Sequence, residues 1–233
     1  MTSGSLTLGL DTALSGCSAA LVGEDGAVLA QRFELIARGH AERLVPMVGD
    51  LLADAGVEPG RITAIAVAQG PGSFTGIRVG LAAARAFGLA WGVPCHGVSS
   101  LAALALAGHG ENAGALGERP FLAAIDASRG QVYAQVFRKA GDTLEALTEP
   151  EALTPAEAAA LARAHGCALG TGSGAALVHE ASGGTLPASA PEWTDAAHVA
   201  RLSRLPGFAQ PPHALYVRPH DARLPGGVLP SGI

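Results

Sequence analysis

The chain has 233 residues, which is enough for one large domain or for two domains of about 110 residues each. Apolar residues make up 48% of it and charged residues 15%, a composition typical of a globular protein with a large core and not of a disordered one. The formal net charge is −5 and Lys and Arg form no cluster. Without concentrated positive charge, the chain is not expected to hold nucleic acid by itself.

The cysteines and the apolar stretches indicate the compartment. Cys17, Cys95 and Cys167 are far apart and form no C-x-x-C pair, which favours reduced thiols over a disulfide framework or a zinc site. The beginning of the chain lacks the basic and apolar regions of a signal peptide. The longest apolar stretches are too short to span a membrane or are interrupted by Arg85. We therefore expect a cytoplasmic protein that does not contact the membrane.

The first half of the chain predicts a mixed α/β arrangement. Three apolar runs separated by glycine-containing turns are typical of an antiparallel meander. Apolar residues at helical spacing then predict a helix, and further strands and helices alternate after it. In chain order, we expect strands at 6–12, 17–22 and 28–33, a helix at 41–55, a strand at 64–68, a helix at 77–91, a strand at 93–98 and a helix from Ser100.

The second half repeats this plan. Asp11 and Asp126 each end a first strand, and Gly16 and Gly130 each open the next one. A match this short can also arise from chance or from a common hairpin geometry, but the repeated order β-β-β-α-β-α favours two related lobes. The later elements are a helix at 155–165, a strand at 167–169 and a glycine-rich turn at 170–174.

Composition suggests where the lobes divide. Residues 108–117 are polar and rich in glycine, which predicts a linker. We place the first lobe at 1–107 and the second at 108–220, and we allow that the last helix returns to the first lobe. Residues 221–233, rich in Pro and Gly, are predicted to form a flexible tail.

A glycine-rich turn between a strand and a helix is the most informative stretch. It has neither the Lys-Ser/Thr pair of a Walker loop nor the spacing G-x-G-x-x-G. It is either a closely packed corner without a ligand, or a point where an anion or the backbone of another chain approaches. The hydroxyls of Ser73 and Thr75 are expected to cap the following helix. The turn consists of Gly70, Pro71, Gly72, Ser73, Phe74, Thr75 and Gly76.

Several motifs resemble the TsaB (YeaZ) family. They are Asp11-Thr12, HAERLVPM from His40, GPGSFTGIRVGLAAARAFG from Gly70, VSSL from Val98, IDASRGQVY from Ile125 and LYVR from Leu215. The resemblance covers most of residues 6–218 and is weakest over 141–210. It implies an α/β fold of two tandem ribonuclease-H-like lobes, each of type β-β-β-α-β-α, as in the actin/Hsp70/sugar-kinase superfamily.

The resemblance also implies a function. The family supplies a non-catalytic subunit to the machinery that adds threonylcarbamoyl to the adenosine next to the anticodon of tRNA. The implied partners are the catalytic paralogue TsaD, the ATPase TsaE and, when TsaD is absent, a second copy of this chain. It implies that tRNA is contacted only through the complex. It also implies no cofactor of the chain's own, and ATP or ADP only at the junction of the complex.

Two enzymatic functions are the alternatives. The family is historically labelled a metallopeptidase, but the H-x-x-x-H pattern of the catalytic paralogue is reduced here to His40, with Leu44 four residues later, so no metal site is predicted. Ser73 lies outside any hydrolase nucleophile motif. A weak phosphotransferase or ATPase would use a vestigial nucleotide cleft, for which the candidates are Asp11, Thr12, Asp126 and Gly172.

The two helices on either side of the glycine turn are the predicted docking face. The first has a broad apolar stripe, and the second has small residues at i, i+4 with two arginines on one side. The alternative is that the small residues pack on the protein's own sheet. The predicted docking residues are Leu44, Met47, Val48, Leu51, Arg78, Gly80, Ala84, Arg85 and Gly88.

Overall fold

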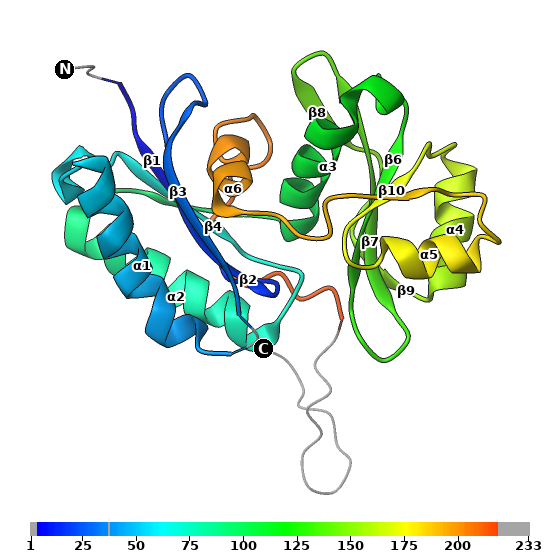
Figure 1. Cartoon of the computed structure of the whole chain (residues 1–233), viewed down its shortest axis with the longest axis horizontal. Coiled ribbons are helices and arrows are strands. Elements are labelled where there is room, and N and C mark those ends of the chain that lie inside the picture. Colours follow the sequence, from blue (N-terminus) through cyan, green and yellow to red (C-terminus); the bar gives the residue numbers. More distant parts are fainter. Residues whose placement is uncertain (1–3, 37, 219–233) are drawn as a thin grey trace, which may run out of the picture.

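The computed structural model describes residues 4–36 and 38–218, which form two β-sheets with helices on their faces (Figure 1). The first sheet has the strand order β3-β2-β1-β4-β5, and the second has the order β11-β10-β6-β7-β8, with β9 paired to β7. The strands of the first sheet are β1 (Thr7–Asp11), β2 (Gly16–Val22), β3 (Val28–Leu35), β4 (Ala64–Ala68) and β5 (Cys95–Val98). Those of the second are β6 (Phe121–Asp126), β7 (Val132–Ala140), β8 (Thr143–Ala146), β9 (Glu151–Leu153), β10 (Gly170–Thr171) and β11 (Ala188–Ser189).

The two sheets share one topology. In each, the first strand is central, an antiparallel meander extends to one side of it, and two parallel strands extend to the other. The repeated plan expected from the strand-ending aspartates is therefore real and extends through the whole lobe. This arrangement confirms the predicted α/β fold of two ribonuclease-H-like lobes.

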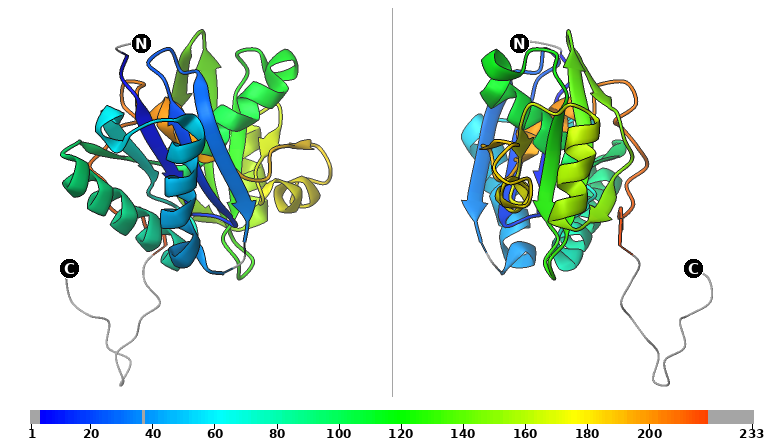
Figure 2. Two further views of the ribbon diagram at one scale, coloured as in Figure 1. Left: turned by 60° about the vertical axis from the view of Figure 1, so that its left-hand side comes forward. Right: turned by 90° about the vertical axis from the view of Figure 1, so that its right-hand side faces the viewer.

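Helices cover the sheets in a consistent pattern. Helices α1 (His40–Ala55) and α2 (Phe74–Trp91) lie on one face of the first sheet, while α3 (Ser100–Leu116) and α6 (Ala196–Leu202) lie between the two sheets (Figure 1). Helices α4 (Pro155–Ala164) and α5 (Ala175–Ala181) cover the outer face of the second sheet, as the turned views of Figure 2 show. A short 3₁₀ helix, Pro59–Arg61, precedes β4. Because β1 and β2 have helices on both faces, all their residues are buried, including the apolar run of β2.

Helix α6 returns from the second half of the chain to the first sheet. A Cβ on Gly9 would overlap the carbonyl oxygen of Ala196, so only glycine in β1 permits this close approach. The backbone N–H of Ala196 donates to Ser18 Oγ on β2 over 3.0 Å. Small side chains, among them Ala20 and Ala200, fill the contact. The last helix thus completes the core of the first lobe.

Two predictions about the second half need correction. Residues 108–116 are not a linker but continue α3, although the helix is irregular at Asn112. Gly108 belongs there because a Cβ would lie 2.6 Å from Thr171 Cγ2, so packing between α3 and β10 outweighs the poor helix propensity of glycine. The strand expected at 167–169 occurs instead at Gly170–Thr171. The lobe boundaries at 107 and 220 stay predictions, and the tail at 221–233 lies outside the described residues.

Candidate docking groove and inter-lobe clefts

The glycine turn is a closely packed corner against the β1–β2 hairpin. The backbone N–H of Ser73 donates to the carbonyl oxygen of Ala13 over 2.7 Å, and Thr12 Oγ1 donates to the carbonyl oxygen of Gly76 over 2.7 Å. A Cβ on Gly76 would overlap the Thr12 carbonyl oxygen. Ser73 Oγ accepts from the N–H of Gly76 over 3.3 Å, which confirms its role as the cap of α2. Within this chain, the turn joins β4, the hairpin and α2.

The segment from Gln210 to Arg218 covers the other side of this corner. The N–H of Leu215 donates to the Gln69 carbonyl oxygen over 2.7 Å. Arg78 Nε donates to the hydroxyl of Tyr216 over 3.1 Å, and Arg85 donates to the carbonyl oxygen of Pro212. Both arginines were among the predicted docking residues. In this structure they hold the chain's own C-terminal segment instead.

Most of the other predicted docking residues lie in the core. Leu44, Met47, Val48 and Leu51 of α1 are at most 1% exposed, because this stripe packs on the first sheet. On α2, Gly80, Ala84 and Gly88 are also buried. A Cβ on Gly80 would lie 2.7 Å from Thr12 Oγ1, and one on Gly88 would overlap Cys95 Sγ. The alternative was right for these small residues: they face the protein's own sheet.

An apolar groove nevertheless runs between the two helices, on their outer sides. It has a volume of about 600 Å³, and Leu44 reaches it while Arg78 lines one border. Val45 is 53% exposed and Phe74 is 48% exposed. Three further lining residues, Val79, Ala82 and Ala86, are not among the predicted docking residues. The sequence does contain a pattern that could have identified this face. Alanines recur at i, i+4 from residue 82, two residues after the start of the repeat of small residues at 80, 84 and 88. The groove is lined mainly by Ala41, Val45, Phe74, Val79, Ala82 and Ala86.

A second hollow, of about 450 Å³, lies between the lobes. The hairpin, the start of α1 and the glycine turn line it from the first lobe, and Asp126, Ser128 and Ser173 line it from the second. Asp126 is exposed there, and its Oδ1 accepts from the N–H of Ser128 over 2.7 Å. The lining includes the carboxylates of Asp126 and Glu192 and neither Lys nor Arg.

The four candidate nucleotide residues do not converge on this cleft. Asp11 is 3% exposed; its Oδ1 accepts from the N–H of Ala13 over 2.9 Å, and its Oδ2 has no partner. Burial raises the pKa of Asp11 to about 7. The Thr12 hydroxyl donates its hydrogen bond to the carbonyl oxygen of Gly76. Gly172 is packed against β6, where a Cβ on it would overlap the Ala124 carbonyl oxygen. Of the four, only Asp126 lines the cleft, so the structure does not bring these residues together there.

The remaining polar features of the cleft are modest. His40 begins α1 and lines the cleft, and its Nε2 has no hydrogen-bond partner. Leu44 stands one turn later, at the position of the second histidine of the H-x-x-x-H pattern, and is fully buried. In the part of the chain that the structure describes, no three His, Cys, Asp or Glu side chains gather where they could bind a metal ion. Over the same residues, no helix combines the length and hydrophobicity needed to cross a membrane.

Comparison with known proteins decides the family. The family model of TsaD, tRNA N6-adenosine threonylcarbamoyltransferase, matches residues 34–171, more than half of the chain. A crystal structure of an uncharacterized protein from Pseudomonas aeruginosa, with similarity to peptidase YeaZ, superposes with a TM-score of 0.77 and 30% identity, over 92% of this chain and 100% of that one. The chain belongs to the TsaB (YeaZ) family.

Curated TsaB proteins match this family member over part of their length. The tRNA threonylcarbamoyladenosine biosynthesis protein TsaB of Escherichia coli is 40% identical over 150 residues, which are 62% of this chain and 62% of the E. coli protein. The TsaB of Haemophilus influenzae is 39% identical over 141 residues, which are 57% of this chain and 54% of that protein. The matched regions therefore cover less than two thirds of these TsaB proteins. The family resemblance drawn from the motifs is confirmed.

Proposed function

We propose that this TsaB-family chain is a non-catalytic subunit in the synthesis of tRNA threonylcarbamoyladenosine. It would bind and activate TsaD, the enzyme that transfers threonylcarbamoyl to the adenosine next to the anticodon, and TsaE would join the complex. The names of the E. coli and H. influenzae relatives support this process, as does the description of the matching family model. In this proposal the chain contacts tRNA only through the complex and works in the cytoplasm.

The observation that carries the proposal is the apolar groove between α1 and α2. Its lining includes four alanines, and Val45 and Phe74, which also line it, expose about half of their surface. A partner that buried these side chains would remove apolar surface from water, which is the main driving force of most protein association. The proposed occupant is the corresponding helix pair of TsaD. When TsaD is absent, a second copy of this chain would present the same groove in a two-fold arrangement.

The inter-lobe cleft supports a non-catalytic role. Its lining carries the carboxylates of Asp126 and Glu192 and no Lys or Arg, so it is poorly suited to a polyphosphate. Asp11, the strand-ending carboxylate of the first lobe, is buried outside the cleft. We therefore propose that the chain has no cofactor of its own, and that ATP or ADP binds only where TsaD contributes to the site.

The proposal is tested by light scattering after size-exclusion chromatography, with the chain alone and mixed with TsaD of the same organism. We expect a dimer of the chain that converts to a heterodimer with TsaD. Ala86→Trp places a large side chain in the groove from an exposed position and should prevent both species. Ala160→Trp, at an exposed position of α4 in the other lobe, is the control of equal bulk and should change neither. If TsaD leaves the elution of the wild type unchanged, the proposal is wrong.

A further inference from the structure

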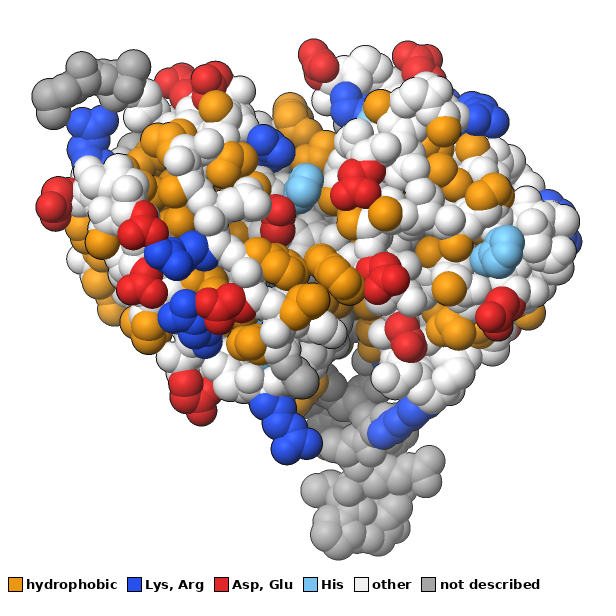
Figure 3. Space-filling view, in the orientation of Figure 1, with side chains coloured by type: hydrophobic (Ala, Val, Ile, Leu, Met, Phe, Trp, Pro, Cys, Tyr) orange, Lys and Arg blue, Asp and Glu red, His pale blue; other side chains and the backbone are white. Residues whose placement is uncertain are grey.

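A smaller hollow between the lobes, separate from the cleft described above, has chemistry of its own. Its volume is about 290 Å³, and Trp193 lines both hollows and so lies between them. Strand β3 contributes Gln31 and Phe33, helix α3 contributes Glu111, and the start of α6 contributes Asp195 and His198. In Figure 3, a His and acidic side chains border the space between the two halves. We name this the β3–α6 pocket.

Aromatic rings form part of its wall. The ring centroids of Phe33 and Trp193 are 6.5 Å apart and the ring planes are inclined by only 19°. Both side chains line the pocket and are partly exposed. The face of an aromatic ring carries partial negative charge, so it attracts cations and stacks well on flat groups.

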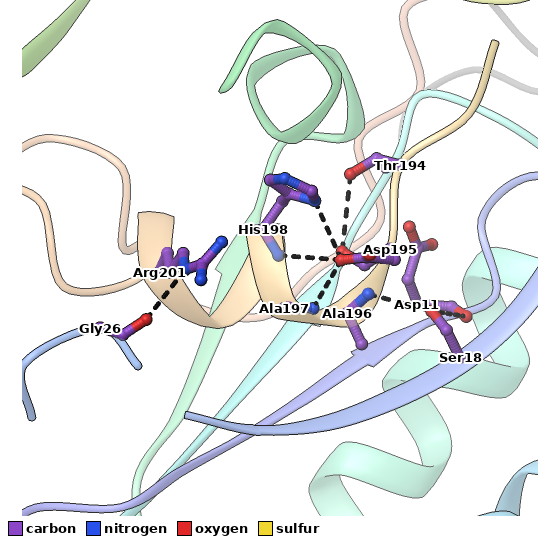
Figure 4. Close-up of polar contacts among 9 residues, drawn as sticks. All are labelled: Asp11, Ser18, Gly26, Thr194, Asp195, Ala196, Ala197, His198 and Arg201. Atoms are coloured by element: carbon purple, nitrogen blue, oxygen red, sulfur yellow. Dashed lines mark hydrogen bonds and ion pairs between the residues drawn. The ribbon is translucent and has the colours of Figure 1, made fainter. Parts of the chain in front are cut away.

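Asp195 supplies the first polar group. Its Oδ1 accepts hydrogen bonds from the N–H groups of Ala197 and His198, over 2.9 and 3.2 Å, and from His198 Nδ1 over 2.9 Å (Figure 4). Burial pushes the pKa of Asp195 upward, but the hydrogen bonds from His198 and from the backbone outweigh it and hold the pKa below its ordinary value. Asp195 is therefore ionised at neutral pH, and its side chain is 25% exposed.

The ionisation of Asp195 determines which hydrogen bond His198 makes with it. An ionised carboxylate can only accept hydrogen bonds, so Nδ1 of His198 must carry the proton that it shares with Asp195. The imidazole is 24% exposed. Glu111 adds a second carboxylate to the lining, which contains neither Lys nor Arg. The two carboxylates of the pocket are thus hydrogen-bond acceptors.

A pocket with acceptor side chains, negative charge and flat aromatic walls matches one functional group well. A guanidinium is planar and positively charged, carries several N–H donors and stacks on aromatic faces. The volume lies just below the range of about 300–1,000 Å³ that suits drug-sized ligands, so the ligand must be small. We propose that the β3–α6 pocket binds a guanidinium group, supplied either by a free small molecule or by an arginine side chain of another protein. A guanine nucleotide is disfavoured because its phosphates would meet the two carboxylates.

The test uses the fluorescence of Trp193. Because the chain has only two tryptophans, Trp91→Phe leaves Trp193 as the only tryptophan. Methylguanidine should change its emission saturably, with a dissociation constant on the order of 1 mM. The neutral, equally flat N-methylurea should produce no saturable change at the same concentrations. Tighter binding of N-acetylarginine amide than of free arginine would identify an arginine side chain of a protein as the source of the guanidinium. Tighter binding of free arginine would identify a free metabolite as the source.

Two variants establish the role of the carboxylates. Glu111→Gln should weaken methylguanidine binding about fivefold, as expected for the loss of one partly exposed ion pair. Asp195→Asn removes the other charge but leaves a residue that caps helices equally well, so it should weaken binding without unfolding α6. Glu118→Gln, at an exposed position after α3 and outside the pocket, is the matched control. Equal binding of N-methylurea, unchanged binding by both pocket variants, or saturable binding of guanosine in place of methylguanidine would overturn the proposal.

Discussion

The side-chain amide of Gln69 donates a hydrogen bond to Oε1 of Gln210 over 3.1 Å, although 141 positions separate the two residues in the chain. The backbones of Gly97 and Gln210 are also paired, with N···O distances of 2.7 and 3.1 Å. The C-terminal segment therefore adds to the edge of the first sheet next to β5 and directly beside the glycine turn. It belongs to the first lobe as much as the strands do.

The first prediction concerns this junction. A Cβ on Gly97 would overlap Gln69 Oε1 and would lie 3.1 Å from Pro212 Cα, so Gly97→Ala must move the Gln69 side chain that is hydrogen-bonded to Gln210 and press on the segment at Pro212. We expect the free energy of unfolding to fall by about 2 kcal/mol. Gly49→Ala is the opposite case, because Gly49 lies inside α1 with open space around it, and it should raise the free energy of unfolding by about 0.5–1 kcal/mol. Urea unfolding of both variants measures the difference, and a loss of stability in both would contradict it.

The second prediction separates the core of α1 from the docking groove. Leu44 is fully buried, so Leu44→Ala should lower the free energy of unfolding by about 3 kcal/mol. Val45 is the adjacent residue but is 53% exposed, so Val45→Ala should change stability by less than about 0.5 kcal/mol. Under the proposed function, Val45→Ala should still weaken the complex with TsaD. Chemical unfolding and titration with TsaD measure the two effects, and equal destabilisation by the two variants would contradict the assignment of the faces.

The third prediction is a pH dependence caused by Asp11. Its pKa is about 7 in the folded chain and near the ordinary value of 3.8 when unfolded. Between these values the folded chain binds the proton more tightly, so this carboxyl makes stability fall as the pH rises from about 4 to 7. Asp11→Asn stays neutral and should raise the free energy of unfolding at pH 8 by up to about 4 kcal/mol relative to wild type. The gain should shrink at pH 5.

A matched variant controls for the loss of a strand-ending carboxylate. Asp126 ends the corresponding strand β6 but is exposed in the cleft, so Asp126→Asn should alter stability little at either pH. Denaturant unfolding at pH 5 and pH 8 compares the two. A constant difference between Asp11→Asn and wild type at both pH values would show that the burial of Asp11 does not control its protonation.

The fourth prediction concerns thiol reactivity. Burial raises the pKa of Cys17 to about 11 and that of Cys167 to about 12, and burial also raises the pKa of Cys95. Since the thiolate is the reactive form, Cys17 and Cys167 of the native chain at pH 8 should react with an aromatic disulfide reagent at least about 100-fold more slowly than free cysteine, and Cys95 should also react more slowly than free cysteine. All three thiols should react rapidly in denaturant. A fast phase in the native chain equal to one thiol would contradict this.

The order of the elements could be predicted from the sequence because it depends on local patterns. Apolar periodicity placed the meander, α1 and α2, and the aspartates that end β1 and β6 indicated the repeat. Helix α3 was cut short at Gly108 because glycine is a poor helix former, and the residue that stabilises it there, Thr171, is far away in the chain.

The assignment of surfaces was less successful for a physical reason. A stripe such as Leu44, Met47 and Val48 is apolar whether it faces a partner or the protein's own sheet, so periodicity finds the helix but not the occupant of each face. The two arginines of α2 were expected to meet another chain. Their contacts with Pro212 and Tyr216 join residues more than 120 positions apart, and no local pattern reports such contacts.

The return of α6 to the first sheet has a consequence for synthesis on the ribosome. Strands β1 and β2 pack against Ala196 and Ala200 on one face, so a nascent chain that ends before these residues leaves that apolar face open to water. The first lobe can reach its final packing only after almost all described residues have left the exit tunnel. Until then its emerging strands are candidates for protection by a chaperone, and a fragment that ends at residue 107 should be insoluble.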